Sequence, residues 1–80
     1  MQDYILYTKD NCKFCVMAKK LLSSEGKNYS EFNITNTSNR ETMFEHIKKS
    51  GAPAPKTVPQ IFHNDKYIGG YTELSKLIHG

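Results

Sequence analysis

The stretch that decides the fold joins a short apolar segment to two closely spaced cysteines, and it reads Tyr4-Ile5-Leu6-Tyr7-Thr8-Lys9-Asp10-Asn11-Cys12-Lys13-Phe14-Cys15. Residues 4–7 are aromatic or branched and lie between polar residues, which is typical of a buried strand. Asp10 and Asn11 supply turn and cap chemistry ahead of a helix. The cysteine pair is therefore expected where a strand is followed by a helix.

The segments that follow, from Cys12 to about residue 50, predict a helix, a strand and a second helix. From Cys12 to about Glu25 a helix is predicted to bury one face, and its apolar positions are Phe14, Met17, Ala18, Leu21 and Leu22. Gly26 is a plausible C-terminal stop. Residues 29–34 alternate with period two, as in a half-buried strand. Ser38 and Glu41 form a capping-box pattern, which predicts a helix from about residue 39 to 50.

The last third of the chain predicts a hairpin and a short helix. Residues 58–63 and 66–68 are expected to pair around Asn64-Asp65, and Thr72 is expected to cap the final helix. The predicted order is β-α-β-α-β-β-α, an α/β fold. With no repeat and no internal boundary, residues 1–80 are expected to form one domain.

Composition excludes several classes of protein. The 80 residues include 11 Lys and Arg against 8 Asp and Glu, a formal net charge of +3. This excess is too small and too scattered to indicate nucleic-acid binding. No apolar run approaches the ~20 residues of a membrane-spanning helix, and none resembles a signal peptide. We expect a cytoplasmic, monomeric protein with no nucleic-acid or membrane partner.

Cys12 and Cys15 are the candidate catalytic residues. The unpaired N–H groups and positive dipole end at a helix N-terminus favour an anion, so the first thiol is expected to be acidic. Lys9 and Lys13 flank it and act in the same direction. Cys15, one turn further along, should be less exposed and less acidic. One activated thiolate and one resolving thiol suffice for thiol–disulfide exchange.

Two other interpretations of the cysteine pair stay open on the residues alone. A zinc site would need two more ligands, and His46, His63 and His79 do not have the spacing of a ligand pair. Two structural thiols are the second alternative, although core filling explains poorly why both lie in one turn at a loop–helix junction. A redox pair is favoured because C-x-x-C beside a βαβ pattern is typical of thioredoxin-like proteins.

Two further motifs indicate a substrate site beside the cysteines. Thr57-Val58-Pro59 stands at the predicted start of a strand, and a cis bond before Pro59 would expose the Val58 backbone to an extended substrate. Gly69-Gly70 allows close backbone approach, and the helix start over residues 71–73 offers N–H donors to a carboxylate. Each motif alone is also compatible with an ordinary turn.

With these motifs in this order, the chain resembles a dithiol glutaredoxin of the compact bacterial or phage type over nearly its whole length. The matching stretches are Tyr7-Thr8-Lys9, Cys12–Cys15, Ala18-Lys19, Leu21-Leu22-Ser23-Ser24, Gly26, Ser50-Gly51, Thr57–Phe62, Ile68–Gly70 and Leu74. The resemblance implies a thioredoxin fold, a four-stranded mixed sheet with the first and third helices on one face and the second on the other. It also implies glutathione as co-substrate and no metal.

The resemblance implies roles for individual residues. Cys12 would be the nucleophile and Cys15 the resolving cysteine. The residues implied to contact glutathione are Lys9, Phe14, Thr57, Val58, Pro59, Gly70, Thr72 and Glu73. Lys9 would meet a carboxylate of glutathione, and Val58 would pair with its cysteinyl backbone. The γ-glutamyl end of glutathione would lie at Gly70, Thr72 and Glu73.

The chain departs from the family pattern at Glu73, where an Asp is more usual, and at two further places. Many dithiol glutaredoxins carry Pro-Tyr between the cysteines, whereas this chain has Lys13-Phe14. The positive charge of Lys13 leads to the hypothesis that Cys12 is more acidic and that the disulfide is easier to reduce. Phe14 lacks the hydroxyl of the usual tyrosine, which removes one hydrogen bond to substrate. The segment from Ala52 to Lys56 is a few residues longer than in compact relatives. Lys56 is a second candidate cation for glutathione, with a solvated loop lysine as the alternative.

We expect a glutathione-dependent thiol–disulfide oxidoreductase that reduces protein disulfides and glutathione mixed disulfides. The resemblance suggests ribonucleotide reductase as one electron acceptor. One alternative is a redoxin reduced by thioredoxin reductase, although Gly69–Glu73 favours a glutathione site. The other is an iron–sulfur cluster carrier, a dimer that would use Cys12 and glutathione as ligands.

Overall fold

The computed structural model describes residues 4–52 and 58–79. Along the chain the elements are β1 (Tyr4–Thr8), α1 (Lys13–Ser24), β2 (Tyr29–Asn33), α2 (Thr37–Ser50), β3 (Gln60–His63), β4 (Lys66–Gly69) and α3 (Tyr71–His79). The strand order in the sheet is β2-β1-β3-β4. β1 pairs parallel with β2 and antiparallel with β3, and β3 pairs antiparallel with β4. The predicted element order and mixed four-stranded sheet are confirmed.

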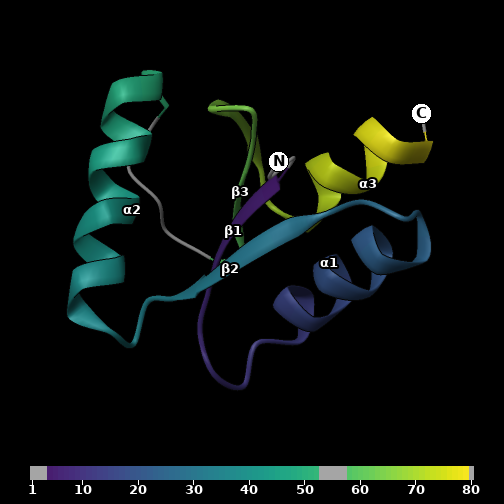
Figure 1. Cartoon of the computed structure of the whole chain (residues 1–80), viewed down its shortest axis with the longest axis horizontal. Coiled ribbons are helices and arrows are strands. Elements are labelled where there is room, and N and C mark those ends of the chain that lie inside the picture. Colours follow the sequence, from purple (N-terminus) through teal and green to yellow (C-terminus); the bar gives the residue numbers. More distant parts are fainter. Residues whose placement is uncertain (1–3, 53–57, 80) are drawn as a thin grey trace.

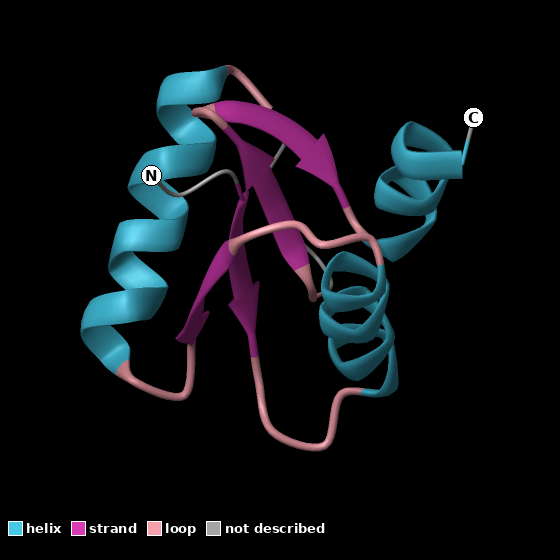
Figure 2. Ribbon diagram, turned by 45° about the vertical axis from the view of Figure 1, so that its right-hand side comes forward, coloured by secondary structure: helices cyan, strands magenta, loops and turns pink. Residues whose placement is uncertain are grey.

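The helices cover both faces of the sheet, α1 and α3 on one side and α2 on the other (Figures 1 and 2). Successive strand residues point to opposite faces, so β1 and β3 each contribute to two cores. Leu6 and Ile61 pack with the α1 and α3 side, and Tyr7 and Phe62 pack with the α2 side. This layering is the thioredoxin fold that the resemblance implied.

Helix α1 begins at Lys13 with Cys12 as its N-cap residue, and Gly26 follows its end with a φ of +67°. Its buried side chains are Cys15, Ala18 and Leu22. The expectation that Phe14 belongs to this buried face is wrong, since its side chain is 52% exposed. Adjacent helical residues are ~100° apart around the axis, so a stripe centred on Cys15 leaves Phe14 at its margin.

The strand β2 and the helix α2 differ in detail from expectation. The strand is present, but it is an edge strand and none of its residues is fully buried, so the expected alternation is weak. The helix begins at Thr37 rather than near residue 39, because the Asn36 side chain accepts a hydrogen bond from the Asn39 N–H at 3.2 Å. The capping box expected at Ser38 is therefore wrong. Gly51 ends the helix with a φ of +78°.

The hairpin and the last helix bring the chain back to the cysteines. The strand β3 starts at Gln60, two residues later than expected, and Asn64 and Asp65 have φ values of +51° and +67°, the signs that a type I′ turn requires. The expected Thr72 cap is wrong, because α3 already begins at Tyr71. The Glu73 carboxylate instead accepts the Gly70 N–H at 2.8 Å.

Candidate active site

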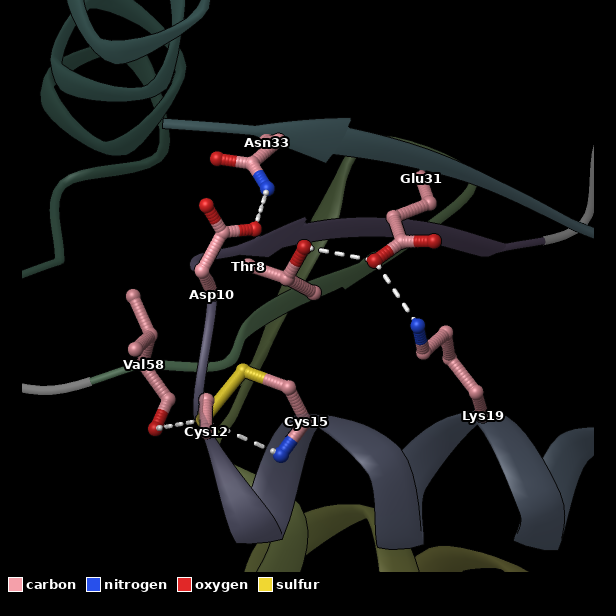
Figure 3. Close-up of a disulfide and its surroundings, with 8 residues drawn as sticks. All are labelled: Thr8, Asp10, Cys12, Cys15, Lys19, Glu31, Asn33 and Val58. Carbon is pink, nitrogen blue, oxygen red and sulfur yellow. Dashed lines mark hydrogen bonds and ion pairs between the residues drawn. A yellow bond between two sulfur atoms is a disulfide. The ribbon is translucent and has the colours of Figure 1, made fainter. Parts of the chain in front are cut away.

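The two cysteines form a disulfide across the first turn of α1 (Figure 3). Cys12 is partly buried, whereas Cys15 is only 2% exposed, as the sequence predicted. The Cys15 backbone N–H donates to the Cys12 sulfur at 3.1 Å. When the pair is reduced, this N–H and the helix N-terminus would stabilise a thiolate at Cys12. The more accessible sulfur is thus also the one whose thiolate the helix start would stabilise.

The segment before β3 brings backbone atoms against this sulfur. The Val58–Pro59 peptide bond is cis, the form in which the Val58 backbone was expected to be exposed to an extended substrate. The Val58 carbonyl oxygen lies 3.7 Å from the Cys12 sulfur. The register of β3 with β1 begins only at Gln60, so Val58 stands outside the strand ladder. Its position is suited to pairing with an extended chain whose sulfur reaches Cys12.

A groove of about 240 Å³ unites most of the predicted glutathione contacts. Its lining consists of Phe14, Val58, Pro59, Gly70, Tyr71, Thr72 and Glu73. These residues come from α1, from the segment before β3 and from the start of α3, so three distant parts of the chain build one concavity. Thr57 lies outside the described residues.

Tyr71 is the groove residue that sequence reasoning missed. Its ring lies against that of Phe14, with centroids 6.0 Å apart and planes inclined by 31°. The available signal was an aromatic residue directly after Gly69-Gly70. The glycine pair indicates close backbone approach, and nothing in it points to the side chain that follows.

The start of α3 is shaped by Glu73. Because its carboxylate accepts the Gly70 N–H, this donor is already engaged within the protein, whereas the N–H donors expected for a substrate carboxylate are those of residues 71–73. Gly69 has a φ of +123°, and a Cβ added there would lie 2.9 Å from the Glu73 side chain. The first glycine of the pair is thus required by backbone conformation and by the close approach of Glu73.

Lys9 lies apart from the other predicted contacts. It lines a separate cavity of about 490 Å³ together with both cysteines, Lys13, Lys19 and Glu31. Within the part of the chain that the structure describes, none of the residues that line the groove of Phe14 and Tyr71 also lines this cavity. The predicted glutathione contacts therefore lie in two places. Lys9 borders the lysine-rich cavity, and the other predicted contacts that the structure describes line the groove.

A polar network in this second cavity was not predicted (Figure 3). The buried Thr8 hydroxyl donates to Glu31 at 2.7 Å, and the Lys19 ammonium lies 3.0 Å from the same oxygen. Partial burial raises the pKa of Glu31, but the hydrogen bond from Thr8 and the charge and hydrogen bond of Lys19 outweigh it and leave the pKa below its ordinary value. A charged carboxylate thereby links α1 to β2 in the cavity that Cys15 borders.

Comparison with known proteins decides between the interpretations of the cysteine pair. The family model described as Glutaredoxin matches residues 4–68. The chain belongs to the glutaredoxin family. This glutaredoxin is 44% identical over 78 residues to Glutaredoxin 3 of Escherichia coli (strain K12), across 96% of this chain and 87% of that protein. Members of the family are thiol–disulfide oxidoreductases, so the cysteines form a redox pair.

Solved structures agree. Glutaredoxin 1 from Francisella tularensis, complexed with cacodylate, matches with a TM-score of 0.74 at 31% identity, covering 96% of both chains. Reduced Escherichia coli glutaredoxin matches with a TM-score of 0.73 at 33% identity, covering 99% of this chain and 94% of that one. Over residues 4–52 and 58–79 there is no cluster of three or more potential metal ligands. None of the helices found there is long and apolar enough to cross a membrane.

Proposed function

We propose that this glutaredoxin uses glutathione as its reductant and reduces both protein disulfides and glutathione mixed disulfides through Cys12 and Cys15. The observation that carries the proposal is the groove that joins Val58 and Pro59 to residues 70–73, with the Val58 carbonyl 3.7 Å from the Cys12 sulfur. A tripeptide thiol can pair its backbone with Val58 and lay its γ-glutamyl end toward Gly70 and Thr72.

With a glutathione mixed disulfide, the Cys12 thiolate attacks the glutathione sulfur. The bond between the two original sulfurs breaks, a Cys12–glutathione disulfide forms, and the released thiolate takes a proton. A second glutathione thiolate then attacks the glutathione sulfur bound to Cys12. This step yields oxidised glutathione and regenerates the Cys12 thiolate.

With a protein disulfide, Cys12 forms a mixed disulfide with one partner sulfur. Cys15 loses its proton, attacks the Cys12 sulfur and releases the partner as a dithiol, so two electrons leave the cysteine pair. Two glutathione molecules then restore the pair and leave as oxidised glutathione. The disulfide in this structure corresponds to the oxidised state of this cycle.

The lysines are assigned a supporting role. We place Lys9 at a carboxylate of glutathione because it is exposed in the cavity that Cys12 borders. Lys56, a second candidate cation, lies outside the described residues. We assign the activity to the cytoplasm, where glutathione keeps thiols reduced, and we keep ribonucleotide reductase as one candidate acceptor.

The deciding experiment measures NADPH consumption with a glutathione mixed disulfide as substrate. One arm contains glutathione and glutathione reductase, and the other contains thioredoxin reductase alone. The proposal requires turnover in the first arm and its loss in Cys12→Ser. Turnover only with thioredoxin reductase would assign the chain to the redoxins, and the groove at residues 70–73 would then have no glutathione role.

A further inference from the structure

Phe14 and Tyr71 together form an aromatic wall along the groove beside the disulfide. Phe14 is 52% exposed, and Tyr71 is only partly buried. Pro59 is buried and lines the same groove. Two neighbouring aromatic rings that remain partly exposed beside the disulfide offer apolar surface that a partner can cover.

Phe14 is among the residues implied to contact glutathione, but glutathione does not explain a wall of two aromatic rings. Apart from its thiol, glutathione consists of a γ-linked glutamate and a glycine, which carry charges and amide groups and no apolar side chain. The backbone of Val58 and the start of α3 match those polar groups, but two aromatic rings would gain little from them. A polypeptide differs from glutathione because its reacting cysteine has neighbours that carry side chains.

The geometry brings such a neighbour to the wall. A partner segment that pairs with Val58 is extended, and its successive residues advance by ~3.3 Å along the groove. With its cysteine sulfur at Cys12, the adjoining residue reaches the groove where Phe14 and Tyr71 lie, since Val58 lines that groove and contacts the Cys12 sulfur. A large apolar side chain there would remove both rings from water.

We propose that Tyr71, together with Phe14, determines specificity for polypeptide disulfides in which an aliphatic or aromatic residue adjoins the reacting cysteine. This inference rests on the proposed thiol–disulfide exchange at Cys12 but not on the identity of the reductant. In the step concerned, the Cys12 thiolate attacks the partner cysteine sulfur. The old S–S bond breaks, and its other sulfur leaves as a thiolate that takes a proton.

The test follows this single step without any glutathione. Two capped tripeptides, Leu-Cys-Leu and Gly-Cys-Gly, carry a 2-thiopyridyl group on the cysteine sulfur. Attack by Cys12 forms the peptide–Cys12 disulfide and releases pyridine-2-thione, whose absorbance gives the rate. The protein carries Cys15→Ser so that the product is not resolved, and each rate is divided by that of a small thiol with the same peptide.

The leucine peptide is expected to react on the order of tenfold faster at subsaturating concentration, because each buried methylene strengthens binding. The preference should appear in the half-saturating concentration rather than in the limiting rate. In Tyr71→Ala it should fall to about twofold or less, whereas Tyr71→Phe, which retains the ring, should keep it. Phe44→Ala is the matched control, because Phe44 is also an exposed aromatic residue, 42% accessible, but lies on α2 across the sheet.

Equal normalised rates for the two peptides in the protein with an intact wall would overturn the inference. So would a preference that survives in Tyr71→Ala while near-ultraviolet circular dichroism shows native packing. The inference would also be contradicted if Phe44→Ala reduced the preference for the leucine peptide as much as Tyr71→Ala does. Because glutathione is absent, a failure of glutathione dependence in the NADPH assay leaves these outcomes unaffected, so the two failures are distinguishable.

Discussion

The two sulfurs of one helical turn face unlike surroundings. Cys12 adjoins a groove of backbone atoms and apolar side chains that three distant segments build. Both cysteines border the cavity in which Glu31 is held by Thr8 and Lys19, but Cys15 is buried whereas Cys12 is only partly so. In the proposed mechanism this difference gives two identical thiols separate roles, since one is accessible to a partner and the other reacts only after that partner is bound.

The largest expected effect comes from replacing each sulfur in turn. Cys12→Ser should lose turnover with every disulfide, because the nucleophile is gone while the hydroxyl can still cap α1. Cys15→Ser should lose only the reduction of protein disulfides and retain turnover with glutathione mixed disulfides. Both activities are measured through NADPH consumption with glutathione reductase. Equal losses in the two variants would show that the sulfurs do not have separate roles.

The groove side can be perturbed through its backbone. Gly69→Ala should lower the free energy of unfolding by about 1–3 kcal/mol, because a side chain at positive φ is strained and the new Cβ would lie 2.9 Å from Glu73. Urea denaturation measures the loss. Gly70→Ala is the matched control, since its Cβ would make only ordinary contacts at 3.5 and 3.6 Å. An equal loss in both variants would contradict the stated role of Gly69.

The cavity side can be perturbed through Glu31. Glu31→Gln should cost about 0.5 kcal/mol near neutral pH, because the ion pair with Lys19 is partly exposed and Gln can still accept from Thr8. The folded-state pKa of Glu31 is depressed, so its contribution is present above the unfolded pKa and is lost as the pH falls through the lower folded pKa.

The measurement is urea unfolding of the wild type and Glu31→Gln across the acid range. The difference in unfolding free energy should be constant near neutral pH and should shrink below the ordinary pKa of a glutamate. A difference that grows as the pH falls would contradict the assigned direction of the pKa shift.

The smallest effect is expected from the charge that replaces the usual proline between the cysteines. Lys13→Ala should slow alkylation of Cys12 by iodoacetamide about twofold at mildly acidic pH, because a solvated lysine stabilises the thiolate weakly. The measurement uses the Cys15→Ser background. Lys20→Ala, a change to another exposed lysine of α1 that does not line the active-site cavity, serves as the control. An unchanged rate in Lys13→Ala would refute the hypothesis that this charge activates Cys12.

Local patterns predicted the succession of elements and the chemistry of the cysteine pair. The apolar run of β1, the period of α1 and the glycine after α2 each depend on residues close in sequence, so they could be inferred directly. The two capping errors have a common cause. Ser38 and Thr72 are both good cap residues, but Asn36 and Glu73 took part in the capping that formed, and the choice between neighbouring candidates depends on where the chain enters the helix.

The site was only partly predictable for a different reason. Resemblance identified the residues that line the groove, apart from Tyr71, and placed Lys9 with them although it borders another cavity. The contact between Thr8 and Glu31 joins residues 23 positions apart. No local pattern encodes it, because it arises from the parallel pairing of β1 with β2.

By itself the sequence determined that this chain folds as an α/β domain with two thiols at a helix start, since hydrophobic period, turn residues and helix-end electrostatics act over a few residues. Tertiary structure alone decided that Val58 would lie against the Cys12 sulfur, that Phe14 and Tyr71 would form one wall, and that Glu31 would carry its charge in the cavity beside Cys15. Those outcomes depend on packing between segments whose separation along the chain carries no information about their distance in space.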